Sequence, residues 1–353
     1  MPRASRLSTS FVPLPSSSLL LSSSTLRDAA LAPSTLRAYD KSLSSFLKHT
    51  RLSLSHLARL SPSDIDTRLS SYIDYLFEHH GSYDYACQAV FGLVYRLPPL
   101  RLQLGEARLR LRGWKRLKKH QSHPPITWEL CVAFAVLMSK WGLHPQAVAT
   151  LLAFDCYLRV GELTRLTYTD VLLPHDPRAG AAHPTMALRL GVTKTGRNQW
   201  VSLNNQHVAQ VLMLYLKSFP FLESDRIFNF SPSSFRHLLH DVSATLGVSH
   251  IPYVPHSFRH GGATCDFLKG STIEQIMFRG RWVAMESAAR YIQTARALLI
   301  MQRVPAELSD DGALLASDLP AVMALLLDSV PAARGTVLPA GVRHVRFRIP
   351  TRF

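Results

Sequence analysis

The sequence predicts a mainly α-helical protein with a small β-sheet, arranged as an N-terminal helical bundle followed by a mixed α/β domain. Apolar residues recur at helical spacing in most segments, whereas strict alternation is confined to residues 185–203. A proline-containing stretch at 120–125 blocks helix continuation and separates the two regions. With 353 residues, the chain is long enough for two domains that each bury their own core.

Composition favours a polyanionic partner. The chain has 40 lysines and arginines against 24 aspartates and glutamates, a formal net charge of +16. This excess is typical of nucleic-acid-binding proteins, although a basic protein with no special partner fits the charge as well. No apolar run approaches the ~18 residues needed to span a bilayer, so we expect no membrane partner.

The cysteines give no sign of a metal site. They are far apart in the sequence and form no Cys/His ligand spacing, so we expect free thiols and no metal or other cofactor. They are Cys87, Cys131, Cys156 and Cys265.

Residues 1–31 are rich in serine, proline and leucine and contain arginines but no acid before Asp28. We interpret them as a disordered leader. The same composition is typical of an organelle transit peptide, so organelle targeting stays open as a second interpretation.

The first domain is predicted at residues 32–120 as a small helical bundle. Ser34 is the predicted N-cap of a helix at 35–47, Ser61 opens a second helix, and a third is expected at 83–97. The last segment of this domain, residues 100–119, is strongly basic.

This basic segment contains no acid after Glu106, so ion pairing inside the run should be unavailable. We therefore favour phosphate contact along a duplex over a merely solvated helix face. The candidate DNA-binding residues are Arg108, Arg110, Arg112, Lys115, Arg116, Lys118 and Lys119.

The second domain is predicted at residues 125–304. A β-hairpin is expected at 185–203, with Lys194 in the turn. One of the helices, at 286–301, carries Tyr291. The remaining residues, 305–353, are expected to hold one apolar helix at 318–330, with Ser317 as its N-cap, and a basic tail. The other helices of this domain are expected at 128–141, 145–152, 208–219, 231–246 and 272–278.

Two pairs of polar residues are each three positions apart. On a helix, His256 and Arg259 would share one face, and an imidazole beside a guanidinium suits phosphoryl transfer. Arg159 and Glu162 have the same spacing, which fits an ion pair that neutralises and orients the arginine and still lets it face a ligand. The stretch His260-Gly261-Gly262 is interpreted as a packing segment whose glycines allow close approach to a neighbour.

In order, the chain offers Arg159, Lys194, His256, Arg259, Trp282 and Tyr291. Over roughly residues 32–299 the chain resembles the tyrosine recombinase (phage integrase) family. The segments that carry the resemblance are YLRVGELTRL, VTKTGRNQWVSL, PHSFRHGGAT and RGRWVAMESAARYIQ. The hairpin and the last segment look most like recombinases of eukaryotic mobile elements, including DIRS-type retrotransposons.

The resemblance implies a SAM-like core-binding bundle and a catalytic domain that breaks and rejoins double-stranded DNA without a metal. Tyr291 matches the nucleophile that forms a 3′-phosphotyrosyl link, and Lys194 matches the lysine that protonates the leaving 5′ oxygen. The remaining groups around the scissile phosphate match Arg159 (with Glu162 as its structural partner), His256 and Arg259.

Members of the family often have histidine directly after the glycine at 280. Here Arg281 follows Gly280, so we assign the corresponding role to Trp282, whose indole N–H can donate to a phosphate oxygen, with Arg281 second. Packing is expected to be part of the role of Trp282 as well. The resemblance also implies a homotetramer on paired sites, with the apolar helix at 318–330 docked either on a neighbouring protomer or on its own domain. If the source is eukaryotic, it implies a nuclear location.

Other functions stay open. An inactive, domesticated DNA-binding protein would share the fold, but decay usually removes the tyrosine or an arginine first, and here the set is complete. A type IB topoisomerase-like relaxing enzyme would share the chemistry and act on one DNA rather than two. A two-metal nuclease and an RNA-binding module are disfavoured because neither a carboxylate cluster nor a stacking aromatic motif is visible.

Overall fold

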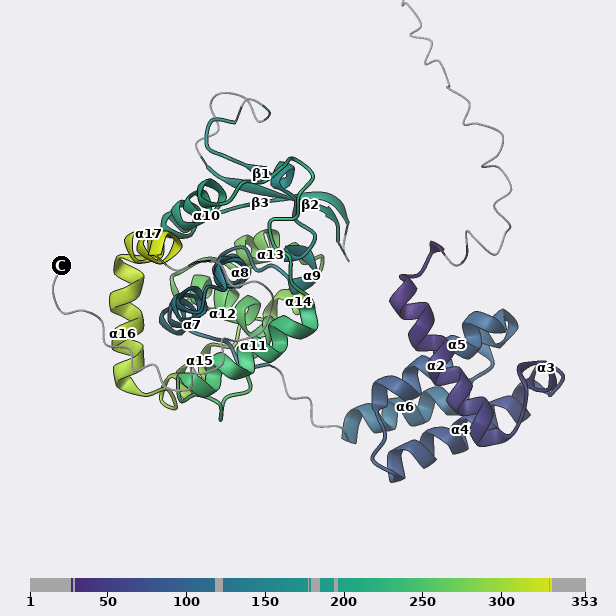
Figure 1. Cartoon of the computed structure of the whole chain (residues 1–353). Coiled ribbons are helices and arrows are strands. Elements are labelled where there is room, and N and C mark those ends of the chain that lie inside the picture. Colours follow the sequence, from purple (N-terminus) through teal and green to yellow (C-terminus); the bar gives the residue numbers. More distant parts are fainter. Residues whose placement is uncertain are drawn as a thin grey trace, which may run out of the picture. The chain divides into compact units, whose positions relative to one another are not determined.

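The computed structural model describes residues 27, 29–117, 123–176, 178, 185–193, 196–329 and 331, without the side chains of Val192 and Arg197. The chain divides into two compact units, Met1–Gln121 and Ser122–Phe353. Most described residues are helical, and one three-stranded antiparallel sheet lies in the second unit (Figure 1). The predicted fold class is therefore confirmed. The predicted leader lies almost entirely outside the described residues.

The first unit is a helical bundle around one apolar core. α2 packs against α5 and α4 packs against α6. Phe46, Leu69, Tyr72 and Leu93 are among the side chains that these helices bury. The helices are α2 (Pro33–Thr50), α3 (Leu54–Leu57), α4 (Pro62–Glu78), α5 (Tyr83–Arg96), the 3-10 helix η2 (Pro98–Leu102) and α6 (Gly105–Leu117).

The predicted N-cap of the second helix is correct, but that of the first is wrong. The Ser61 hydroxyl accepts a hydrogen bond from the backbone N–H of Asp64 at the start of α4, at 3.1 Å. α2 begins before Ser34, with Ala32 at the N-cap and Pro33 in the first turn. Proline is favoured there because its fixed φ suits the helix and its missing N–H would have had no partner.

The basic helix α6 is held by a buried acid. The carboxylate of Asp66 accepts hydrogen bonds from the backbone N–H groups of Glu106 and Ala107, at 2.8 and 2.9 Å. These donors belong to the first turn of α6, where a helix has no partner of its own for them and favours negative charge. The carboxylate therefore stabilises the start of α6.

The second unit is built around α7 and α8, whose residues are almost all buried. α16 packs along α7, while α10 and α12 pack along α8 (Figure 1). Helices that are apolar on all sides are typical of a buried core. The elements are α7 (Trp128–Lys140), α8 (His144–Asp155), α9 (Val160–Leu163), η3 (Tyr168–Asp170), β1 (Val171–Leu172), β2 (Ala187–Val192), β3 (Arg197–Ser202), α10 (Gln206–Ser218), α11 (Pro232–Thr245), α12 (Pro255–Leu268), α13 (Ile273–Gly280), α14 (Met285–Ala289), α15 (Thr294–Met301), α16 (Ala306–Ser317) and α17 (Leu319–Ser329).

The sheet has the order β1-β2-β3, and both pairs are antiparallel. On β2, the buried Leu188 pairs with Val171 on one side and Val201 on the other. The predicted hairpin is thus confirmed. The sequence did not predict β1, because two residues are too few to show alternation.

Two glycines let α12 lie directly against the end of α8 and the residues that precede α7. A Cβ on Gly261 would stand 2.1 Å from the Ile126 carbonyl oxygen, and one on Gly262 would stand 2.1 Å from the Phe154 carbonyl oxygen. No side chain fits at these distances. The predicted close approach is confirmed, and it places the polar residues of α12 beside α9.

The predicted helix at 286–301 is wrong, because the structure has two short helices, α14 and α15, with Tyr291 in the turn between them. The Tyr291 carbonyl accepts a hydrogen bond from the Thr264 hydroxyl at 3.1 Å, and the same hydroxyl accepts one from the Gln293 N–H at 3.0 Å. These backbone groups are bonded to α12 instead of continuing a helix.

The C-terminal region holds two helices rather than the one predicted. Ser317 ends α16 and its hydroxyl donates to the Leu314 carbonyl, so it is not an N-cap. Pro320 interrupts the helical ladder because it has no N–H to donate. α17 packs on α10 and α7 of its own unit. Among the described residues no single helix is long and apolar enough to span a membrane. The pair α16–α17 passes that test of length and composition only as a pair bent by 86°.

The α12 contact can be tested by adding one methyl group. We expect Gly262→Ala to lower the free energy of unfolding of the second unit by about 3 kcal/mol, because the backbone of Phe154 has to shift. Gly191→Ala is the control, since a Cβ there meets nothing within 4 Å. Chemical denaturation followed by circular dichroism measures both, and equal stability of the two variants would contradict the packing described.

Candidate active site

One carboxylate joins two arginines from distant segments. The Arg159 guanidinium donates to Glu162 Oε1 at 2.8 Å, and its backbone N–H donates to Oε2 at 2.9 Å. Arg281, which follows α13, donates to the same Oε2 at 3.0 Å. The side chain of Glu162 is only 3% exposed and that of Arg281 only 5%, whereas that of Arg159 is 22% exposed. Arg159 is therefore the arginine of this group that solvent reaches most.

A second, deeper arginine comes from α12. Arg259 is 1% exposed, and its terminal nitrogens donate to the carbonyls of Tyr157 and Gly280, the latter at 2.7 Å. Its guanidinium carbon lies 4.4 Å from the centroid of the Trp282 ring and 5.1 Å from that of Tyr291. These two rings cover the flat face of the guanidinium, and such cation–π contacts stabilise a desolvated arginine.

The arginines make the site strongly positive. The pKa of Arg259 falls to about 10, first because burial disfavours the charged form and then because Arg159 and Arg281 repel it. Burial also lowers the pKa of Arg281, with the charge of Glu162 opposing. Two guanidiniums thus share one buried carboxylate and a third lies close by, which is an arrangement suited to a phosphate or another anion.

Tyr291 lies over this cluster with its backbone anchored to α12. Its ring stacks on His260 at a centroid distance of 4.4 Å and lies 4.7 Å from Trp282. Its side chain is partly exposed. Sequence order alone placed Tyr291 near the arginines, and the structure brings them together.

The other tyrosines considered are poorer nucleophiles. Burial raises the pKa values of Tyr157, Tyr215 and Tyr253, and an aspartate raises that of Tyr157 further. Tyr168 stacks on Phe221 at 6.1 Å. Of these residues, none contacts Arg259 through its ring as Tyr291 does.

His256 is half-buried on the first turn of α12. Its pKa is lowered, first by burial and then by His123, Arg259 and Arg159. Its ring lies 5.9 Å from that of His123. His256 is therefore mainly neutral at pH 7, the form that can accept a proton.

Trp282 is 7% exposed and needs Gly280 beside it, because a Cβ on Gly280 would lie 1.9 Å from the indole ring. The structure therefore places Trp282 as a wall behind Arg259 and Tyr291. From the sequence we expect both a phosphate contact and a packing role for Trp282, and the described contacts agree with packing.

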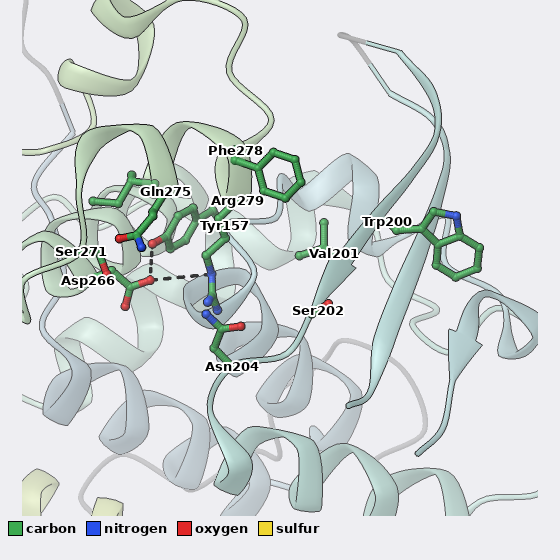
Figure 2. Close-up of a pocket in the computed structure, with 11 residues that line it drawn as sticks. Tyr157, Trp200, Val201, Ser202, Asn204, Asp266, Ser271, Gln275, Phe278 and Arg279 are labelled. Atoms are coloured by element: carbon green, nitrogen blue, oxygen red, sulfur yellow. Dashed lines mark hydrogen bonds and ion pairs between the residues drawn. The ribbon is translucent and has the colours of Figure 1, made fainter. Parts of the chain in front are cut away.

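A buried network missed by the sequence analysis supports this wall. Arg279 lies 2.7 Å from Asp155 and 3.7 Å from Asp266, and the Tyr157 hydroxyl donates to Asp266 (Figure 2). Burial raises the pKa of Asp155 to about 6, with Arg279 opposing. Tyr157 has a left-handed φ of 49°, and its carbonyl accepts from Arg259. Arg279 and Asp155 are 124 residues apart, so no local spacing could have linked them.

The same network lines a cavity of about 420 Å³ between β3 and α13. Figure 2 shows Trp200 and Phe278 at its sides, and both are exposed, Phe278 to 88%. Another cavity, of about 270 Å³, lies between α9 and β2 and is lined by Glu162 and Thr193, among others. The first strand of the hairpin thus ends near the shared carboxylate. Lys194 itself lies outside the described residues.

The basic run on α6 is less uniform than predicted. Arg110 pairs with Asp74 and with Glu106, each at 2.7 Å, so the expectation that acids are unavailable to this run is wrong. Arg112, Lys115 and Arg116 are exposed and Arg108 is half-buried. Lys118 and Lys119 lie outside the described residues.

The described residues include no group of three or more histidines, cysteines, aspartates or glutamates that could hold a metal ion. All four cysteines are free, as expected. The chemistry that the described side chains offer is therefore anion binding by arginines, proton transfer by a neutral imidazole, and a hydroxyl nucleophile.

No protein-family model matches the chain, and no curated protein is similar to it in sequence. The solved structures that are similar to the chain over most of its length include the following three. The crystal structure of XerA recombinase has 18% identity and a TM-score of 0.37, covering 80% of this chain and 96% of that one. The Tn1549 transposon integrase in complex with circular intermediate DNA has 15% identity and a TM-score of 0.45, covering 75% and 98%. A variant of that integrase in complex with transposon right end DNA has 15% identity and a TM-score of 0.42, covering 76% and 98%. Since all three TM-scores lie below 0.5, the argument for a function rests on the site itself.

The burial of His260 gives a pH-dependent stability. The pKa of His260 falls to about 4, mainly because burial disfavours the charged imidazole, while the Tyr291 carbonyl opposes the shift. The unfolded chain therefore binds one more proton than the folded chain between pH 6.5 and 4. This contribution, about 3 kcal/mol, is present above pH 6.5 and is lost as the pH falls toward 4.

We expect His260→Phe, which keeps a ring against Tyr291 but cannot titrate, to lose this contribution. Denaturation at pH 7 and pH 4.5 should show a smaller acid destabilisation in the variant than in the wild type. Asp155, with its raised pKa, acts in the opposite sense in both proteins and cancels in the difference. Identical acid sensitivity in the two proteins would show that His260 is not buried as described.

Proposed function

We propose that this chain is a tyrosine recombinase that cuts and rejoins double-stranded DNA through a covalent link between Tyr291 and the 3′ phosphate. The observation that carries the proposal is the meeting of Arg159, Arg259 and Arg281 around one carboxylate, directly beside a partly exposed tyrosine. An excess of guanidinium next to a hydroxyl nucleophile suits attack on a phosphodiester.

The proposed reaction is an in-line displacement. The Tyr291 oxygen attacks the scissile phosphorus, the bond from phosphorus to the 5′ oxygen breaks, and the enzyme keeps the 3′ phosphate. The tyrosine proton passes to a base, the role that we propose for the neutral His256, and the leaving 5′ oxygen takes a proton from Lys194. Because the phosphodiester energy is kept in the new link, the reverse reaction reseals the strand without ATP.

The arginines have separate parts in this proposal. Arg159, the most exposed, would contact a non-bridging phosphate oxygen as negative charge builds up in the transition state. Arg259 has five N–H groups and uses two of them on carbonyls, but Tyr291 and Trp282 cover its face. Its contact with a phosphate therefore requires the Tyr291 ring to move toward the DNA, which is the motion that the attack itself needs.

DNA is the proposed partner of both units. The net charge of +16 and the exposed face of α6, with Arg112, Lys115 and Arg116, support it. Assembly as a tetramer on paired sites, kinship with DIRS-type elements, and a nuclear location for a eukaryotic source belong to the same proposal.

The covered Arg259 also fits the second candidate, an inactive DNA-binding descendant, in which Tyr291 would never leave its place. Both candidates bind DNA, and a topoisomerase-like enzyme would also form the covalent link. Formation of an adduct separates the inactive candidate from the two enzymes. Joining of two separate duplexes then separates recombination from relaxation.

The nucleophile assignment predicts the behaviour of Tyr291→Phe. With nicked duplexes of randomised sequence, the wild type should form a protein–DNA adduct that survives denaturation. The variant should form none, because it lacks the attacking oxygen, yet bind duplex DNA nearly as tightly. The matched control is Tyr168→Phe, which should react like the wild type. An adduct formed by the Tyr291 variant would show that another residue is the nucleophile.

The α6 face predicts how salt affects DNA binding. Arg112→Ala and Arg116→Ala should each reduce the slope of log affinity against log salt by about 0.9, since each removes one phosphate contact. Arg110→Ala is the comparison and should change the slope less, because Arg110 is already paired with Asp74 and Glu106. Titrations between low and moderate salt measure the slopes. Equal slopes in all three variants and the wild type would place the DNA elsewhere.

A further inference from the structure

Arg281 occupies a backbone position that does not favour it. It follows α13 in the left-handed region, with φ 55° and ψ 40°, where glycine is usual. An L-residue is disfavoured there, because its Cβ lies too close to the following carbonyl oxygen. Its side chain is also buried, with Nε lacking a hydrogen-bond partner. A charged side chain that is buried on an unfavourable backbone conformation needs a compensating interaction. The shortest hydrogen bond of Arg281 is the one to Glu162.

The shared carboxylate decides how much charge Arg159 can offer. Glu162 and Arg159 alone would form a neutral pair, which attracts an anion weakly. The Arg159 guanidinium binds Oε1 of Glu162 and the Arg281 guanidinium binds Oε2, so the group of three carries a net charge of +1. Arg281 is too buried to be the group that meets the anion first, whereas Arg159 is accessible.

We propose that Arg281 is a positioning residue. It competes with Arg159 for the negative charge of Glu162, so that the charge of Arg159 is not fully neutralised and the guanidinium stays oriented toward the anion. The inference rests on the proposed function, under which the anion is the scissile phosphate of DNA. It replaces the expectation that Arg281 is a secondary phosphate contact. It also explains why an arginine stands where the chain geometry favours glycine.

The experiment is a charge-compensation test on the full chain, with inorganic phosphate as the probe. Phosphate should raise the melting temperature of the wild type, and the midpoint of that effect gives its affinity. Arg281→Met, which has similar bulk and no charge, should weaken phosphate about tenfold, because Glu162 then neutralises Arg159. The double variant Glu162→Gln, Arg281→Met removes both charges and should recover to within about threefold of the wild type.

The outcomes separate the possible roles. If Arg281 itself touched the anion or only held the fold, the double variant would be no better than Arg281→Met, and the proposal would be wrong. It would also be wrong if Arg281→Met bound phosphate like the wild type, or if the phosphate effect survived Arg159→Ala. Circular dichroism checks folding. Arg281→Lys, which keeps the charge, is the second variant and should stay within about threefold of the wild type.

The same variants should rank in the same order in the rate of adduct formation with nicked duplexes. This second readout keeps the two proposals apart. If the phosphate affinities follow the predicted order but the wild type forms no adduct, the proposed role of Arg281 is supported and the proposed recombinase activity is contradicted. If the wild type forms the adduct but the double variant does not recover, only the role of Arg281 fails.

Discussion

The candidate site depends on a single constraint, which is that one buried carboxylate has to hold two arginines while a third lies close by. Glu162 is almost fully buried and satisfies Arg159 and Arg281 through both of its oxygens. The pKa of Arg259 is lowered, first by burial and then by repulsion from Arg159 and Arg281. An anion brought into such a site relieves the repulsion. The folded protein therefore holds these positive charges in position before any ligand binds.

The fold brings these side chains together from distant parts of the chain. Gly261 and Gly262 let α12 lie against the backbone of Ile126 and Phe154. Arg259 then reaches the Gly280 carbonyl at the end of α13, and Arg281 reaches Glu162 on α9. Behind the arginines, the network of Arg279 with Asp155 and Asp266 fixes the turn at Tyr157. The carbonyl of that turn receives Arg259. The close packing at the two glycines and the ion pairs of the buried arginines thus lie in the same region, around the turn at Tyr157.

Much of this could be predicted from the sequence, because it depends on short-range patterns. The spacing of Arg159 and Glu162 gave the ion pair, alternation gave the hairpin, and the two glycines gave the close approach of α12. Some of the failures share a physical cause, which is that long-range bonds override local periodicity or leave no local signal.

Two examples show this. The helix expected around Tyr291 is broken because Thr264, on another helix, takes its carbonyl. The ion pair between Arg281 and Glu162 joins residues 119 positions apart, so no local pattern in the sequence indicates it. The most direct test of the account is to digest the covalent DNA adduct of the wild type and identify the modified peptide by mass spectrometry. The account predicts a nucleotide attached to Tyr291, and a nucleotide on any other residue, or no adduct with any duplex in a randomised pool, would contradict it.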